Sequence, residues 1–156
     1  MVNHMTLKEV LEDSIQKEIM SRFLYVGLRQ RVKHQATKDA FQALAEQEET
    51  HQRILEQYLQ GKLKEGALGH DIVVDYKIAE HLDQPEISPT MELKEVFLLA
   101  ANREKAAHEL YASLAEIHPA GQIKHLLIDL ADQELQHKKR IETLYTEVAF
   151  PQTDGG

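Results

Sequence analysis

The stretch Leu44-Ala45-Glu46-Gln47-Glu48-Glu49-Thr50-His51 has a counterpart 86 residues later, Leu130-Ala131-Asp132-Gln133-Glu134-Leu135-Gln136-His137. At the same offset, Glu18 and Leu24-Tyr25 align with Glu104 and Leu110-Tyr111. Each half therefore contains a glutamate, a Leu-Tyr pair and the pattern LA-x-Q-E-x-x-H, with 30 residues between its first and its second aligned glutamate. Two copies of one structural unit explain this repeat.

The residues around the repeat predict an all-α chain. The 7 glycines and 4 prolines cluster mainly near residues 61–69, 85–89, 119–121 and 151–156, and the segments between these clusters are rich in good helix formers. We expect four helices at about residues 6–34, 37–61, 91–117 and 120–148. A short helix is expected at 75–82, and the best strand candidate, 72–76, is short.

The lengths of the connections predict the topology. Tight turns around 34–37 and 119–121 give two antiparallel helical hairpins, whereas residues 62–90 are long enough to cross a bundle from end to end. The fold class is therefore all-α, a ferritin-like four-helix bundle of two hairpins joined by a long crossover. We expect one domain over residues 1–150 and a short tail over 151–156.

The composition excludes several classes of function. With 18 Lys+Arg against 26 Asp+Glu, the formal charge of −8 argues against nucleic acid or an anionic membrane as a partner. The absence of cysteine excludes disulfides, thiolate metal sites and a catalytic thiol. The longest apolar run, 96–101, is too short to span a membrane, and the first residues do not resemble a signal peptide, so a cytoplasmic location is expected.

Ionisable residues interrupt the stripe that should be apolar in each helix. At heptad-like spacing, every helix carries a glutamate on its buried face, and two helices also carry a histidine. Each glutamate pair is centred on its hairpin turn, which places all six groups in one layer about 22 Å from the turns. The set is Glu18, Glu48, His51, Glu104, Glu134 and His137.

Four ionised carboxylates in one apolar layer require compensation. No lysine or arginine occupies these stripes, so we expect none to neutralise the glutamates. Two divalent cations would balance the charge, and oxygen ligands with imidazole suit iron or manganese. The alternative is a buried carboxylate–histidine hydrogen-bond network without metal.

The sequence resembles the rubrerythrin branch of the ferritin-like di-iron proteins over nearly its whole length, including 75–82 and Arg103-Glu104-Lys105-Ala106-Ala107-His108-Glu109-Leu110-Tyr111. The resemblance implies that Glu18 and Glu104 are terminal ligands, each to one iron. It implies that Glu48 and Glu134 bridge the irons, and that His51 and His137 bind one each. Tyr25 and Tyr111 match tyrosines that hydrogen-bond the ligands; the alternative for both is plain core packing.

Three departures from the family pattern are visible. The chain has no cysteine for the rubredoxin domain of full-length rubrerythrins. Ala107 stands where rubrerythrins carry an extra glutamate, and the last motif ends in His137, so the ligand set looks closer to the symmetric bacterioferritin type. Because no fifth helix follows residue 148, a 24-subunit storage cage is not expected.

The resemblance implies a non-haem di-iron oxidoreductase with two iron ions, for which manganese or zinc could substitute. It would reduce hydrogen peroxide or dioxygen, with a role in oxidative stress, and take electrons from an external donor such as a rubredoxin-like protein. It would act as a homodimer. The alternatives are an iron-binding ferroxidase that handles iron without catalytic peroxide turnover, and a helical interaction module with a vestigial site.

Several further residues carry weaker expectations. His108 could swing toward a metal or remain a partly exposed helical residue, and Gln47 and Gln133 could reach a ligand or simply face solvent. Gly27 suggests a close helix approach, and His81 a dimer contact. The residues expected at the surface are Glu46, Glu49, Glu109, His4, His34, His70, His118 and His125.

Overall fold

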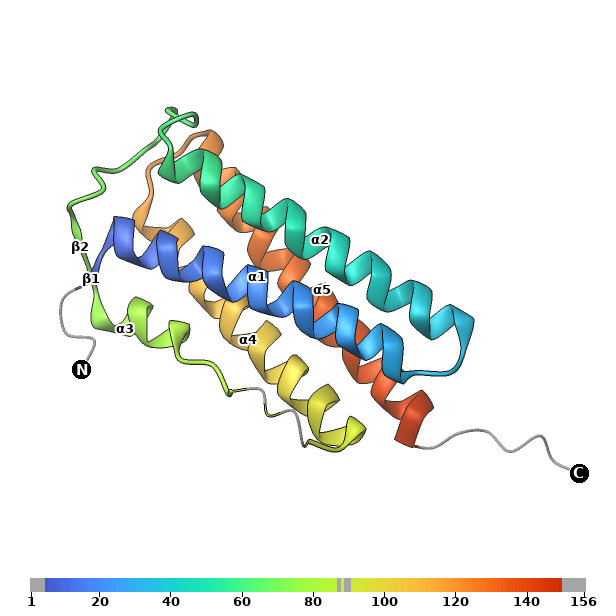
Figure 1. Ribbon diagram of the computed structural model, residues 1–156. Helices are drawn as coiled ribbons and strands as arrows, with labels where there is room; N and C mark the ends of the chain where they lie inside the picture. Colours follow the sequence, from blue (N-terminus) through green and yellow to red (C-terminus); the bar gives the residue numbers. More distant parts are fainter. Residues whose placement is uncertain (1–4, 87, 89–90, 150–156) are drawn as a thin grey trace, which may run out of the picture.

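Four long helices form the body of the molecule in a computed structural model (Figure 1). The structure describes residues 5–86, 88 and 91–149, and for residues 148 and 149 it describes the backbone only. The long helices are α1 Leu7–Arg31, α2 Gln35–Leu59, α4 Leu93–Ile117 and α5 Gln122–Ala149. Between α2 and α4 lie β2 Val73–Val74, α3 Tyr76–Ala79 and the 3₁₀ turn η1 Glu80–Leu82. The predicted all-α, ferritin-like bundle is confirmed, with helix ends within a few residues of those expected.

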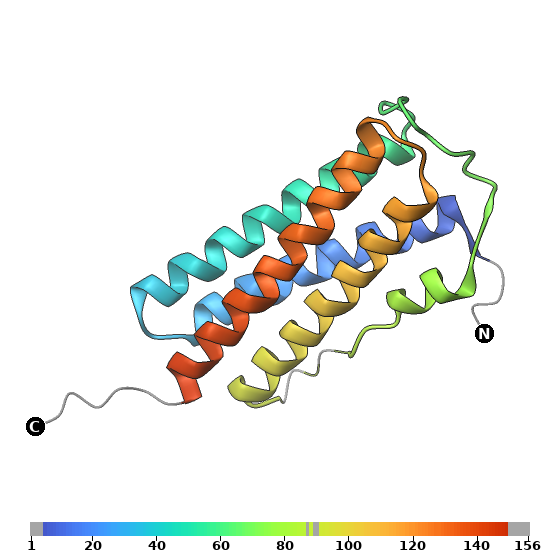
Figure 2. The same cartoon turned by 180° about the vertical axis from the view of Figure 1, so that it is seen from behind.

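The helices pair as two antiparallel hairpins, α1 with α2 and α4 with α5. The segment after α2 runs the length of the bundle, so that α4 begins at the end where α1 finishes (Figure 1). Viewed from behind, α3 and η1 lie against α4 near the start of α1 (Figure 2). This is the predicted arrangement of two hairpins joined by a crossover.

A small sheet fixes the crossover to the beginning of α1. The expected strand at 72–76 forms as β2 and pairs antiparallel with β1, Met5–Thr6, a partner that the sequence pattern did not reveal. Thr6 also starts α1 with a capping box: its hydroxyl accepts from the Glu9 N–H at 3.2 Å, and the Glu9 carboxylate accepts from the Thr6 N–H at 3.3 Å.

The loop after α2 packs on the turn between α4 and α5. Gly66 has a φ of 79°, and a Cβ there would lie 3.3 Å from the Pro119 carbonyl oxygen, so both the backbone conformation and the close contact favour glycine. Beside it, the Tyr58 hydroxyl lies 2.6 Å from His118 Nε2 and accepts from the Leu68 N–H. His118 is 2% exposed, so its prediction as a surface residue was wrong.

The apolar core is divided into two clusters by the layer of ionisable residues. One cluster fills the end near the small sheet, and the other fills the end near the α1–α2 turn. In the second cluster, Tyr25 stacks on Phe41 with ring centroids 6.1 Å apart, and Phe97 meets Phe41 edge to face at 5.4 Å. The polar layer is therefore closed from above and below by side chains that exclude water.

The outer face of α1 contradicts one expectation. A Cβ at Gly27 would meet no atom within 4 Å, so the predicted close helix approach was wrong. Phe23 on the same helix is 61% exposed and has the Arg22 guanidinium 5.2 Å from its ring centroid. Across the described residues, no helix combines the length and apolar character needed to cross a membrane.

Candidate metal centre

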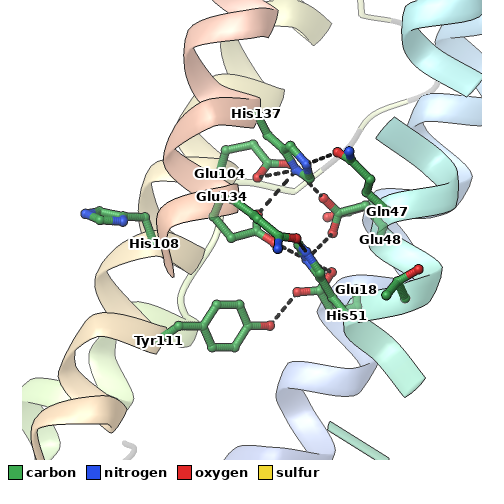
Figure 3. Close-up of polar contacts among 12 residues, drawn as sticks. Glu18, Gln47, Glu48, His51, Glu104, His108, Tyr111, Glu134 and His137 are labelled. Carbon is green, nitrogen blue, oxygen red and sulfur yellow. Dashed lines mark hydrogen bonds and ion pairs between the residues drawn. The ribbon is translucent and has the colours of Figure 1, made fainter. Parts of the chain in front are cut away.

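The structure brings all six predicted ligand residues into one layer at the middle of the bundle. Each long helix contributes one glutamate, and α2 and α5 each add a histidine one turn further on (Figure 3). None of the six is more than 4% exposed. Helical spacing of three residues puts each Glu-x-x-His pair on one face, which explains why both groups point inward.

The six side chains form two overlapping groups that could each hold one metal ion. The first group is Glu18, Glu48, His51 and Glu134; the second is Glu48, Glu104, Glu134 and His137. Within each group the ligand atoms lie within 4.8 Å of one another. Because Glu48 and Glu134 belong to both groups, two ions bound here would share them.

The two imidazoles face the carboxylates through Nδ1. His51 Nδ1 lies 2.6 Å from Glu134 Oε1 and 3.7 Å from Glu18 Oε2. His137 Nδ1 lies 3.0 Å from Glu48 Oε1 and 3.6 Å from Glu104 Oε2. The rings are stacked with centroids 5.6 Å apart and an angle of 11° between their planes.

The opposite ring nitrogens bind glutamine side chains in a crossed arrangement. Nε2 of His51 lies 2.7 Å from Gln133 Oε1, and Nε2 of His137 contacts Gln47 Oε1. An amide oxygen can only accept, so we assign a proton to each Nε2, which leaves Nδ1 as the atom available to a metal. Both glutamines are exposed residues, and their amide oxygens also contact the ligand imidazoles. They therefore face solvent and reach a ligand at the same time.

Two tyrosines also form hydrogen bonds from one helical hairpin to the other. The Tyr25 hydroxyl donates to Glu104 and the Tyr111 hydroxyl donates to Glu18, in each case to Oε1. Both tyrosines are 1% exposed and lie one heptad from the glutamate on their own helix. Each donated hydrogen bond fixes one carboxylate oxygen and leaves the other, Oε2, facing the centre of the layer.

Burial and mutual repulsion dominate the electrostatics of the layer. Burial, followed by repulsion from neighbouring carboxylates, raises the pKa of Glu48 and of Glu134 well above the ordinary value. Burial also acts to raise the pKa of Glu104, but its contacts with Glu134 and His137 and the hydrogen bond from Tyr25 lower it to about 2. Burial opposes a charge on His51, yet the contact with Glu18 raises its pKa.

These contacts fit a metal better than a metal-free network. A nitrogen lone pair at Nδ1 of His51 and a carboxylate oxygen 2.6 Å away repel each other unless a proton or a cation lies between them. Glu18 Oε2 and Glu104 Oε2 are buried with no hydrogen-bond partner. Four carboxylates and two imidazole nitrogens are a donor set for two divalent ions, with proton release on binding.

A buried arginine that the sequence analysis did not single out lies beside this layer, outside the stripes that carry the ligands. Arg103 is 2% exposed and donates from Nη1 to the Pro85 carbonyl oxygen at 3.2 Å and from Nη2 to Ser21 Oγ at 3.5 Å. No ion pair within 4.0 Å joins it to a carboxylate among the described residues. The signal was available, because 96, 100, 103, 107 and 110 form a second stripe on α4.

The other candidates lie outside the cluster. His108 points away from it in Figure 3, and its Nδ1 lies 2.7 Å from the Ala131 carbonyl oxygen. His81 Nδ1 lies 3.3 Å from the Glu109 carboxylate, and Glu49 pairs with Arg22 at 3.8 Å. His4 lies outside the described residues.

Comparison with known families agrees with this geometry. The sequence model of the family described as Rubrerythrin matches residues 9–145. The chain belongs to the rubrerythrin family. Its members' ferritin-like di-iron domain is the structure expected from the repeated Glu-x-x-His motif, so the resemblance stated from sequence is confirmed. Among curated proteins, none matches the chain significantly.

Two solved structures share the fold of this rubrerythrin-family chain. A hypothetical protein from Pyrococcus furiosus is 25% identical, with a TM-score of 0.75, and the alignment covers 95% of this chain and 93% of that chain. A protein from Thermotoga maritima, described as a candidate ferritin-like diiron-carboxylate protein, is 21% identical with a TM-score of 0.72, covering 94% and 98%. The similarity to the second protein shows the fold alone.

Proposed function

We propose that this chain is a di-iron carboxylate oxidoreductase that binds two iron ions and reduces hydrogen peroxide or dioxygen with electrons from an external donor. The observation that carries the proposal is the pair of four-residue ligand groups that share Glu48 and Glu134. In this assignment, Glu18 with His51 and Glu104 with His137 each complete one half of the centre. Manganese or zinc could occupy the same ligands.

The residues of the chain hold this centre and protect it. A bound pair of iron ions would supply the electron transfer that amino acid side chains cannot. Tyr25 and Tyr111 orient the terminal carboxylates, and Gln47 and Gln133 orient the imidazoles. The apolar clusters above and below keep bulk water from the layer, which strengthens every electrostatic interaction inside it.

The electron balance calls for a separate donor. Reduction of one hydrogen peroxide to two waters consumes two electrons and two protons, and dioxygen needs more of both. The chain has no cysteine, and therefore no thiol or thiolate-bound iron of its own to store electrons. We infer a rubredoxin-like protein or another small reductant as donor, and a homodimer as the working form.

A second candidate function is iron oxidation for iron handling. The ligand set favours it, because the two halves are symmetric and Ala107 offers no additional carboxylate. In that case ferrous iron is the substrate, and the protein accepts more than two iron ions per chain over repeated cycles.

The test is anaerobic loading with ferrous iron, followed by peroxide or air. We expect two iron ions per chain, oxo-bridged ferric absorbance after oxidation, and repeated peroxide consumption when a reductant is added. Glu48→Ala and Glu134→Ala should abolish paired binding because each removes a ligand of both groups. Glu49→Ala is the matched control, since Glu49 is the exposed neighbour of Glu48.

The outcomes separate the candidates. Iron uptake far above two per chain without peroxide turnover would favour the iron-handling function. Absence of metal binding, or binding that survives the loss of Glu48 and Glu134, would rule out the dimetal centre itself and leave the metal-free network or a vestigial site.

A further inference from the structure

A small cavity opens from the metal-ligand layer between α1 and α4. Its lining includes the four ligand glutamates together with Lys17, Ser21, Gln84 and Arg103. About 10 Å³ within it is available to the centre of a water-sized molecule, which is the room that one water, or one end of a small linear ligand, requires.

Among the residues that the structure describes, most buried side-chain polar atoms without a hydrogen-bond partner belong to residues lining this cavity. Among the described residues, five buried side-chain polar atoms have no hydrogen-bond partner, and four of them belong to cavity residues. Glu18 Oε2 and Glu104 Oε2 are the oxygens that face the metal positions, whereas Gln84 Oε1 and Arg103 Nε are not ligand atoms. Buried polar atoms are nearly always hydrogen-bonded, so Arg103 Nε–H is a donor available to a ligand in this cavity.

The charge of the cavity depends on metal. With two divalent ions bound, all four ligand glutamates would be ionised, and the ions would cancel their four negative charges. Arg103 would then keep its positive charge, because a guanidinium does not lose its proton at any ordinary pH, and it is buried without an ion-pair partner among the described residues. Half-buried Lys17 adds a second positive charge at the mouth. The loaded site therefore offers a position for an anion.

Lys17 borders both this cavity and a larger groove. The groove has a volume of about 960 Å³, is formed with α3 and η1 and is bordered by Asp13, His81 and Asp83. One flexible side chain therefore lies between the inner cavity and the outer groove. A ligand as small as peroxide could enter here without passing through either apolar cluster.

We propose that Arg103 and Lys17 form a binding site for a small monoanion of the hydroperoxide class, next to the metal ligands, and that the site forms only when metal is bound. This inference rests on the proposed dimetal centre. Arg103 Nε–H donates to the anion, and Arg103 is held in place by the Pro85 carbonyl and Ser21 hydroxyl. Arg103 is a specificity-determining residue, since it favours an anion over neutral dioxygen.

Azide titration of the ferric protein tests the proposal, with the azide-to-iron charge-transfer absorbance as the readout. Arg103→Gln should retain two iron ions per chain and raise the azide Kd about tenfold or more. This is the change in Kd expected from the loss of one hydrogen bond to a charged group. Lys17→Gln, at the half-buried mouth, should raise it severalfold. Lys105→Gln removes a charge from the exposed face of α4, the helix that carries Arg103, and should leave the azide Kd unchanged.

The metal content of each variant is measured first, which separates this proposal from the dimetal centre. If the wild type binds no metal, the proposed function fails; if metal binds and Arg103→Gln takes up azide like the wild type, only the anion site fails. If Arg103→Gln loses metal, the azide Kd of Lys17→Gln becomes the test. A Kd for Lys17→Gln equal to that of the control Lys105→Gln would then overturn the proposal. Azide binding to the metal-free protein can be measured by calorimetry. If the metal-free protein binds azide as tightly as the metal-loaded protein does, the proposal is also overturned.

Discussion

At the scale of single residues, the two histidines are oriented by neutral partners. Gln133 and Gln47 accept the Nε2–H bonds of His51 and His137, each from the opposite helical hairpin. Each glutamine therefore ties one ligand motif to the other, and the imidazole planes are set before metal arrives. An amide accepts this proton without adding a fifth or sixth negative charge to the layer.

Replacing Gln47 or Gln133 by leucine should weaken metal binding. The imidazole would lose the hydrogen bond that fixes its tautomer, and such partners typically contribute about 10- to 100-fold to metal affinity. Competition with a coloured chelator measures the affinity. Gln42→Leu, at an exposed glutamine that pairs with Glu46 on the same helix, is the control; an equal loss in this variant would contradict the assigned role.

Tyr25→Phe and Tyr111→Phe should destabilise the protein by similar amounts. Each removes a buried hydroxyl that donates to a carboxylate, a loss of about 1.5–3 kcal/mol in the free energy of unfolding. The internal repeat predicts the similarity, because the two contacts are equivalent. Urea unfolding measures both, with Tyr76→Phe as control since Tyr76 is 55% exposed. No change in either variant would mean that the tyrosines serve only as core packing.

At the scale of the elements, the ends of α2 and α4 are joined by a buried hydrogen-bond chain. The Leu68 N–H donates to the Tyr58 hydroxyl, which donates to His118 Nε2, while His118 Nδ1–H donates to the Leu114 carbonyl oxygen at 2.6 Å. Burial lowers the pKa of His118, so the chain is built for the neutral imidazole. A second proton would place two donors against each other at Tyr58.

The contribution of His118 to the stability of the wild type should therefore fall as the pH drops below about 6.5. In the unfolded chain His118 takes up a proton near that pH, whereas in the folded chain its lowered pKa delays uptake, so protons favour unfolding. His118→Gln keeps a donor and an acceptor without titrating, and should lose less stability between pH 7 and pH 5. His125→Gln, at an exposed histidine, should follow the wild type; identical curves for all three proteins would contradict the inference.

The elements that the sequence predicted correctly are those in which buried residues recur at a regular helical spacing. The repeated motif and the stripes of the four long helices fixed the ligand layer, because a one-residue error there would move Glu48 to the surface. The elements that escaped prediction depend on contacts between distant segments. The β1–β2 pair and buried His118 both arise where the crossover packs on the bundle, and no local pattern encodes where a crossover lies.

At the scale of the whole molecule, the bundle places an unfavourable polar layer between two apolar clusters. Each cluster could in principle continue through the middle, and the protein would gain stability if it did. The layer is retained at a cost that bound cations would offset, so metal binding and folding are coupled. The metal-free protein should consequently unfold at a lower temperature than the loaded protein.

The double variant Glu48→Gln, Glu134→Gln should make this coupling measurable. Burial raises the pKa of both carboxyls, so the metal-free wild type loses stability as the pH rises and they are forced to ionise. The amides remove that cost, and the metal-free variant should be more stable than the metal-free wild type by about 1–4 kcal/mol at neutral pH. The difference should shrink at pH 5, where more of the wild-type carboxyls hold protons.

The same variant should gain no stability from metal, which distinguishes a binding centre from a structural network. Glu46→Gln, Asp132→Asn removes two charges at equivalent exposed positions of the repeat and should behave like the wild type. Calorimetric unfolding of chelator-treated and metal-loaded protein measures all six states. If Glu48→Gln, Glu134→Gln destabilised the metal-free protein, the carboxylates would be holding the bundle together through their hydrogen bonds to His51 and His137, and the layer would be structural rather than a cation site.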